Sequence, residues 1–291
     1  SSHKGSVIIE NDNKMPGAKW YPEAKLNFAA NLLKFRHDST ALIFCGEDGA
    51  REEISYALLY QRVAALVGGL KKYDIKPGDR IAGFMPNVID SIVAMLATAS
   101  LGAVWSSCSP DFGINGVLDR FGQIEPRLLF TTDGYYYNGK TLNSLERVAG
   151  IAASLPSIEA IVVCDHVTQT ADLSLLNNAV PNKAIHLKDF IDVNATEIEF
   201  VDCSFDDPLY IMYSSGTTGV PKCIVHGIGG TLLQHNKEHF LHTDVSPVDV
   251  MFYYTTCGWM MWNWLVSGLS LGCTVLLYDG SPFKTPSILM D

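Results

Sequence analysis

The fold class is decided by residues 80–108, which read RIAGFMPNVIDSIVAMLATASLGAVWSSC. The short apolar run 80–85 predicts a strand, because Pro86 and Asn87 break it. Residues 88–101 then show the length and apolar content of a helix that stops at Gly102, and 103–108 predict a second strand. Strands this apolar, joined by a helix, favour a parallel sheet covered on both faces.

The same alternation extends to both sides of this unit. A helix is predicted from Leu58 to Leu70 with Ser55 as its N-cap, and residues 46–49 predict a hairpin turn. Further helices are expected at 142–155, 227–242 and 259–271. Further strands are expected at 41–45, 128–131, 160–164, 198–201, 209–213, 222–225, 251–255 and 274–278. The sequence therefore predicts an α/β protein with mostly parallel sheets flanked by helices.

Composition limits the classes of function. Hydrophobic residues make up 47% of the 291 residues and charged residues 18%, which provides for a large core. The formal net charge of −10 disfavours a nucleic-acid partner. Residues 250–278 carry no charge, but Gly258, Gly268 and Gly272 interrupt them, so we expect no membrane span. Seven scattered cysteines without a C-x-x-C pair indicate free thiols in a reducing compartment, hence a cytoplasmic location.

The sharpest local signal is Tyr213-Ser-Ser-Gly-Thr-Thr-Gly-Val-Pro-Lys222, directly after a predicted buried strand. Glycines allow the backbone to approach a ligand, and successive amides can form an anion-binding nest. Lys222 adds a mobile positive charge. The string differs from the P-loop pattern, and by itself a polar turn between two strands is an equally good interpretation. The predicted phosphate-binding residues are Ser214, Ser215, Gly216, Thr217, Thr218, Gly219 and Lys222.

This string resembles the phosphate-binding signature of the adenylate-forming superfamily. Further segments resemble its acetyl- and acetoacetyl-CoA synthetase branch, and the acetoacetyl-CoA synthetases in particular. These segments are 20–28, 105–113, 117–121, 137–140, 229–231, 255–264 and 278–282. The resemblance covers nearly the whole chain. It implies an arm at 1–40 that packs on an incomplete N-terminal adenylation domain at 41–291, with the family's small C-terminal domain absent.

The resemblance also implies a reaction. An acid–thiol ligase of this kind would join acetoacetate to coenzyme A through an acyl-adenylate, using ATP with Mg²⁺ and releasing AMP and pyrophosphate. Lys222 and Thr217 would act on the phosphates. Trp259, Met260 and Met261 correspond to the acyl pocket, and Gly139 and Lys140 to a contact with coenzyme A. No structural metal is expected, and the oligomeric state stays open.

Several family motifs do not occur in these 291 residues: an aromatic-Gly-x-Thr-Glu segment, a ribose-binding Asp, an Arg near the phosphate and a C-terminal catalytic Lys. Residues 288–291 also resemble the first turn of a helix. We therefore expect a piece of a longer protein that is inactive alone.

Three alternatives remain open at this point. The chain could be a non-catalytic nucleotide-binding fragment, or it could come from an acetyl- or propionyl-CoA synthetase. His235-Asn-Lys-Glu-His239 matches a short zinc-peptidase pattern, but no distal third ligand stands out.

Overall fold

Two sheets form the framework of the protein. The computed structural model describes residues 2–214 and 219–284. Among these, the larger sheet has seven strands in the order β12-β11-β8-β6-β7-β14-β15, all parallel except β15. Their bounds are β6 Arg80–Phe84, β7 Val104–Cys108, β8 Leu128–Thr132, β11 Ala160–Cys164, β12 Ala184–His186, β14 Pro208–Tyr213 and β15 Cys223–Gly227.

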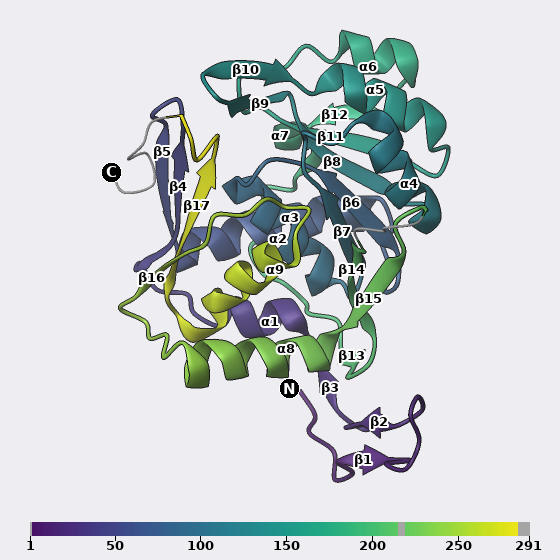
Figure 1. Ribbon diagram of the computed structural model, residues 1–291, viewed down its shortest axis with the longest axis vertical. Coiled ribbons are helices and arrows are strands. Elements are labelled where there is room, and N and C mark those ends of the chain that lie inside the picture. The colour runs from purple at the N-terminus through teal and green to yellow at the C-terminus, as the bar shows by residue number, and fades with distance from the viewer. Residues whose placement is uncertain (1, 215–218, 285–291) are drawn as a thin grey trace.

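The smaller sheet has the order β16-β17-β4-β5, in which β5 alone is antiparallel. Its strands are β4 Thr40–Gly46, β5 Arg51–Ser55, β16 Val250–Phe252 and β17 Thr274–Asp279. A separate hairpin of β9 (Gly134–Tyr137) and β10 (Lys140–Asn143) follows β8. It lies above the gap between the two sheets in Figure 1.

Helices separate the two sheets and cover the far face of the larger one (Figure 1). The long helices α2 and α3 pack on each other between the sheets. Helices α4, α5 and α6 cover the opposite face of the larger sheet. The helices are α1 Phe28–Leu32, α2 Tyr56–Lys72, α3 Ile89–Ser100, α4 Ile114–Ile124, α5 Leu145–Ser154, α6 Ser174–Ala179, α7 Leu187–Phe190, α8 Ile228–Lys237 and α9 Met260–Ser267.

Each face of the larger sheet has its own apolar core. The inner core joins α2 and α3 to both sheets and includes Trp105 and Trp262, each at most 1% exposed. The outer core lies under α4 and α5 and includes Phe84 and Phe121. Burial on both faces explains why the parallel strands are so uniformly apolar. The predicted α/β class is confirmed.

The predicted elements differ from the structure in a few places. Residues 198–201 form no strand, because their amides bond elsewhere: Ile198 N donates to Tyr60 Oη and Val201 N donates to Ser100 O. Helix 227–242 changes at Glu238 to a π-helical turn that ends at His242, and α9 continues as a 3₁₀ turn, Gly268–Leu271. Helix α4 and the β9–β10 hairpin were not predicted.

The N-terminal residues combine an exposed hairpin with buried anchors. Strands β1 (Ile9–Glu10) and β2 (Lys19–Trp20) pair with each other and project below α8 in Figure 1. Strand β3 (Lys25–Leu26) pairs with β13 (Cys203–Ser204). Asn27 Nδ2 donates to Ala99 O at 3.0 Å. The division of the chain at residue 40 stays a prediction.

The hydrophobic stretch near the C-terminus is divided among β16, α9 and β17. In the described part of the chain, no helix combines the length and hydrophobicity needed to cross a bilayer.

Candidate active site

A cavity of about 300 Å³ opens where strands of both sheets end. Strands β6, β7 and β17 each contribute the residues just beyond or at their carboxyl ends, and the β9 hairpin closes one side. The lining residues are Pro86, Asn87, Ser109, Pro110, Asp111, Tyr135, Tyr136, Tyr137, Thr255, Thr256, Tyr278, Asp279 and Gly280. Ligands of open α/β sheets bind in such crevices outside the carboxyl ends of strands.

Buried hydrogen bonds fix the wall formed by Asn87 and the segment after β16. The indole of Trp262 donates to Asn87 Oδ1 at 2.9 Å, and this indole is fully buried. Ser107 Oγ donates to Cys257 O at 2.6 Å, which ties the segment to the end of β7. A Cβ at Gly258 would lie 3.3 Å from Ser109 N, so the backbones approach closely there. This wall is therefore preorganised.

A buried carboxylate joins the other walls. Asp279 is 6% exposed, and its Oδ2 accepts from Tyr136 N at 3.4 Å. The same oxygen lies 3.1 Å from His166 Nε2. Burial raises the pKa of Tyr278 to about 12 and also raises the pKa of Tyr136. Both phenols are consequently neutral hydroxyl groups near pH 7, and Tyr278 Oη donates to Ser281 O at 3.2 Å.

The glycine-rich string connects β14 and β15, and its ends are fixed to each other. Ser214 N donates to Lys222 O, and Lys222 N donates to Ser214 Oγ, both at 3.0 Å. Gln123 Nε2 of α4 donates to Pro221 O at 2.7 Å. Gly219 has a φ of +122°, which strains any residue with a side chain. The Lys222 side chain is exposed. Ser215, Gly216, Thr217 and Thr218 lie outside the described residues.

The other predicted site residues are divided between two positions. Gly139 and Lys140 lie at the tip of the β9–β10 hairpin, next to Tyr137 of the cavity wall. Trp259 and Met260 precede and begin α9, and they are 65% and 44% exposed. Neither lines the 300 Å³ cavity, to which the same segment contributes Thr255 and Thr256 instead. Met261 is half-buried.

Sequence reasoning named none of the residues that line this cavity as site residues. Asn87, Ser109 and Asp279 had a usable signal, since each lies at or just after the end of a predicted strand. Tyr137 begins the segment 137–140 singled out by resemblance, whereas Tyr135 and Tyr136 had no signal, because the hairpin that carries them was not predicted.

Glu238 and His239 of the zinc-like pattern have structural partners. His239 Nε2 lies 2.9 Å from Trp264 O and 3.0 Å from Ser267 Oγ. Glu238 accepts from Trp264 Nε1 at 2.9 Å. Burial lowers the pKa of His235 to about 4 and also lowers the pKa of His239. Within residues 2–214 and 219–284, no group of three or more His, Cys, Asp or Glu residues is arranged to hold a metal ion.

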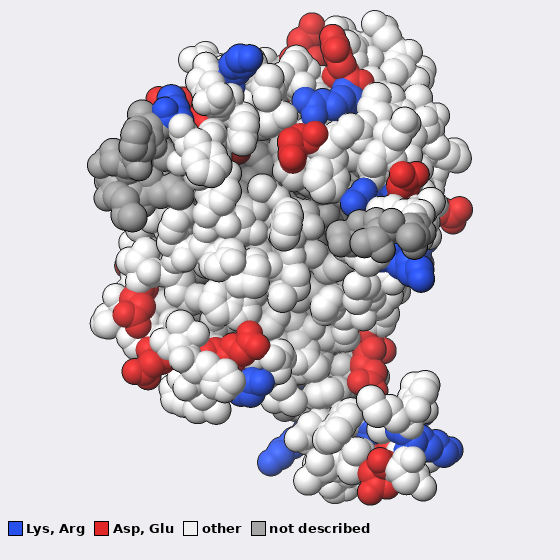
Figure 2. Space-filling view, viewed as in Figure 1, with Lys and Arg blue, Asp and Glu red and all other residues white. Residues whose placement is uncertain are grey.

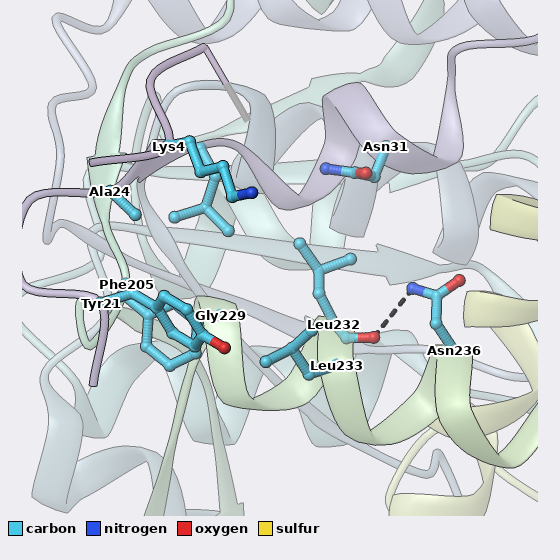
Figure 3. Close-up of a pocket in the computed structure, with 10 residues that line it drawn as sticks. Lys4, Tyr21, Ala24, Asn31, Phe205, Gly229, Leu232, Leu233 and Asn236 are labelled. Atoms are coloured by element: carbon cyan, nitrogen blue, oxygen red, sulfur yellow. Dashed lines mark hydrogen bonds between the residues drawn. The ribbon is translucent and has the colours of Figure 1, made fainter. Parts of the chain in front are cut away.

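A larger cavity, of about 440 Å³, lies on another part of the molecule, between the N-terminal segment, α1 and α8. Figure 3 shows the Lys4 ammonium directed into it beside Asn31, above Leu232 and Leu233. Tyr21 and Phe205 close one end, with ring centroids 5.1 Å apart. Its walls are mainly apolar and no carboxyl end of a parallel strand reaches them.

Charged side chains are sparse over the centre of the face that carries α9 (Figure 2). Lysines, arginines and carboxylates gather near the edges of this view. Exposed apolar side chains include Phe252 at the end of β16, Trp259 just before α9 and Met260 at its first residue.

Comparison with known proteins agrees with this geometry. The family described as AMP-binding enzyme matches residues 28–291. The chain therefore belongs to the AMP-binding enzyme family, the class of adenylate-forming α/β enzymes.

Three relatives show which members of this family the chain is similar to. The chain is 49% identical to the acetoacetyl-coenzyme A synthetase of Rhizobium meliloti (strain 1021), over 96% of this chain and 42% of that protein. It is 46% identical to the acetoacetyl-CoA synthetase of Gallus gallus, over 94% of this chain and 42% of that protein. A malonamoyl-CoA synthetase of Penicillium aethiopicum is 45% identical, over 95% of this chain and 39% of that protein.

A solved structure gives the same result in three dimensions. The acetoacetyl-CoA synthetase from Streptomyces lividans matches with a TM-score of 0.87 and 42% identity, over 94% of this chain and 41% of that one. The chain thus spans about two fifths of the length of the relatives that it matches.

Proposed function

We propose that the protein carrying this chain is an ATP-dependent acid–thiol ligase that forms acetoacetyl-CoA from acetoacetate, ATP and coenzyme A. The single observation that carries the proposal is the glycine-rich string between β14 and β15, in a chain up to 49% identical to acetoacetyl-CoA synthetases. Its ends close on each other through Ser214 and Lys222, beside a sheet whose other strand ends line a cavity.

The proposed reaction needs positive charge where acetoacetate meets the phosphates of ATP. In the first step an acetoacetate oxygen attacks the α-phosphorus of ATP, a P–O bond forms and pyrophosphate leaves. In the second step the sulfur of coenzyme A attacks the acyl carbon, the thiol proton is released and AMP leaves. Both substrates of the first step are anions, so amides of the loop and the Lys222 ammonium would offset their repulsion. ATP would enter as its magnesium complex.

The predicted contributions of the other residues stay proposals. Thr217 and its neighbours would donate to the phosphates. Trp259, Met260 and Met261 would border the acyl group, and Gly139 and Lys140 the nucleotide end of coenzyme A. The position of the hairpin tip beside Tyr137 supports the last assignment, because it borders the cavity at the strand ends.

A second acid is favoured by one relative. The Penicillium aethiopicum protein is named for malonamoyl-CoA, so malonamate is the second candidate substrate. Malonamoyl-CoA differs from acetoacetyl-CoA only in its acyl group, and both would be formed by the same type of reaction.

Acid-dependent ATP–pyrophosphate exchange tests this proposal. The full-length protein that carries this chain should exchange labelled pyrophosphate into ATP with acetoacetate, and more slowly with malonamate, acetate or propionate. Exchange with none of these acids, by a protein that binds ATP, would favour a non-catalytic nucleotide-binding protein. The 291-residue chain alone should show no exchange, because the family's Thr-Glu and C-terminal Lys motifs are outside it.

We also propose a reducing compartment, the cytoplasm, for this protein. All seven cysteines are free, and burial raises the pKa of the Cys108, Cys164 and Cys257 thiols. Such thiols are unreactive.

A further inference from the structure

A buried carboxylate that no motif singled out joins three segments around the cavity. Glu47 belongs to the turn between β4 and β5 and is 5% exposed. Its Oε1 accepts from Gly139 N at 2.7 Å, and its Oε2 accepts from Asn138 N at 3.0 Å. Oε2 also accepts from Ser281 N at 2.7 Å. One side chain therefore binds the tip of the β9–β10 hairpin and the segment after β17.

The hairpin tip depends on such an acceptor. Asn138 and Gly139 both have positive φ, 52° and 74°, as in a two-residue hairpin turn. The amides of these two residues point to Glu47 rather than to solvent. Although both residues are exposed, their amides bond to one carboxylate, which holds the turn in this orientation.

The backbone after β17 is shaped around the same side chain. Glu47 N donates to Asp279 O at 2.9 Å. Gly280 has a φ of +145°, and a Cβ there would lie 2.5 Å from Glu47 Cβ. Glycine at this position allows the carboxylate to reach both segments. Asp279 and Gly280 line the cavity, as does Tyr137 at the base of the hairpin turn.

We infer that Glu47 is a positioning residue: it fixes the Asn138–Gly139 turn against the smaller sheet, and thereby sets the edge of the cavity where coenzyme A is proposed to bind. The inference rests on the proposed function for its link to coenzyme A. Glu47 does not line the cavity itself, so it acts through the turn and through the segment after β17.

The Glu47→Gln variant separates positioning from general stability. A glutamine keeps the shape but replaces one acceptor oxygen by a donor, so at least one of the three amides loses its partner. In the full-length protein, we expect the KM for coenzyme A to rise about tenfold. Acetoacetate-dependent ATP–pyrophosphate exchange without coenzyme A should stay within about twofold of the wild type, since the phosphate loop is at a different strand end.

A matched control variant is available in the β4–β5 hairpin, which also carries Glu47. Glu53 of β5 is exposed and forms an ion pair with Arg51 at 2.6 Å, and Glu53→Gln should leave both measurements unchanged. An unchanged KM for coenzyme A in Glu47→Gln would overturn the inference. Equal losses in exchange and in thioester formation would overturn it as well, because they indicate a purely structural role.

Amide hydrogen exchange gives a second readout that does not depend on turnover. Exchange at Asn138 and Gly139 should be at least about tenfold faster in Glu47→Gln, and equal rates would contradict the role of Glu47. If the wild type shows no acid-dependent ATP–pyrophosphate exchange, the proposed function fails. Amide hydrogen exchange alone then decides whether Glu47 fixes the turn. If Glu47→Gln does not fold, Glu47→Asp carries the same tests, and failure of both to fold overturns the inference.

Discussion

The two cavities described above differ in the residues that surround them. The cavity between α1 and α8 has about 440 Å³ and apolar walls, with Lys4 as its one lining cation among the described residues. The cavity at the strand ends has about 300 Å³, but it collects polar groups from both sheets and from the β9–β10 hairpin. By volume the first cavity would be the candidate active site, but the polar groups around the second make it the better candidate.

The difference follows from how parallel sheets are built. At the carboxyl end of each strand the chain leaves the sheet, and residues such as Asn87, Ser109 and Asp279 need not fit an apolar core. Strands that end at the same edge bring these residues together. The cavity between α1 and α8 is instead a gap between apolar side chains, which offers few directed contacts to an anionic substrate.

The largest effect should come from Lys222. Lys222→Ala in the full-length protein should lower acetoacetate-dependent ATP–pyrophosphate exchange by roughly 100- to 1,000-fold, because the developing negative charge at the phosphates loses its ammonium partner. Thermal unfolding should change little, since the side chain is exposed. The measurement is isotope exchange at saturating substrates, and turnover equal to the wild type would contradict the role of the loop.

The next effect is on stability and concerns His235 of α8, the helix that borders the larger cavity. Burial lowers the pKa of His235 to about 4, below an ordinary value of 6.5. As the pH falls, His235 therefore takes up a proton in the unfolded state before it does so in the folded state. The contribution of neutral His235 to the free energy of unfolding is fully present above pH 6.5 and is lost between pH 6.5 and about pH 4. The loss should reach roughly 3 kcal/mol.

Urea unfolding at several pH values measures this loss. His235→Gln should reduce the pH dependence between 6.5 and 4 by about one proton, whereas His242→Gln, at an exposed position, should leave it unchanged. An unchanged slope in His235→Gln would show that this histidine does not resist protonation.

A smaller effect is expected at the wall of the strand-end cavity. Trp262→Phe removes the bond to Asn87 and leaves a small void, which should lower the free energy of unfolding by about 1–3 kcal/mol. Trp259→Phe, at a position 65% exposed, should change it by less than about 0.5 kcal/mol. Equal effects of the two substitutions, measured by urea unfolding, would mean that the Trp262–Asn87 bond adds nothing.

The smallest effect should come from the larger cavity. Lys4→Ala and Leu233→Ala remove its cation and part of its wall, and both should leave ATP–pyrophosphate exchange within about twofold of the wild type. A loss of exchange comparable to that of Lys222→Ala would move the candidate site to this cavity.

Much of the fold could be predicted because its strands are apolar on both faces. The unit 80–108 appears as β6, α3 and β7 with boundaries shifted by one residue or so, and Ser55 caps α2 by accepting from Leu58 N. Periodicity could not predict residues 198–201, whose amides bond to Tyr60 and Ser100. These partners are far away in the sequence.

The site was predictable only where a local pattern carries it. The string from Tyr213 to Lys222 is continuous, so its position between two strands could be anticipated. Glu47 could not, because its partners Asn138, Gly139 and Ser281 are brought to it by the β9–β10 hairpin and by the pairing of β17 with β4. Trp262 likewise has a role through Asn87, which is 175 residues away in the sequence.

Hydrogen exchange measured by mass spectrometry, with and without ATP and acetoacetate, tests the central claim most directly. The full-length protein should show protection in peptides that cover residues 209–227, where the loop between β14 and β15 would bind the phosphates. Peptides covering residues 21–33 and 229–237, around the larger cavity, should exchange as before. Protection confined to the larger cavity, with none at residues 209–227, would contradict the account.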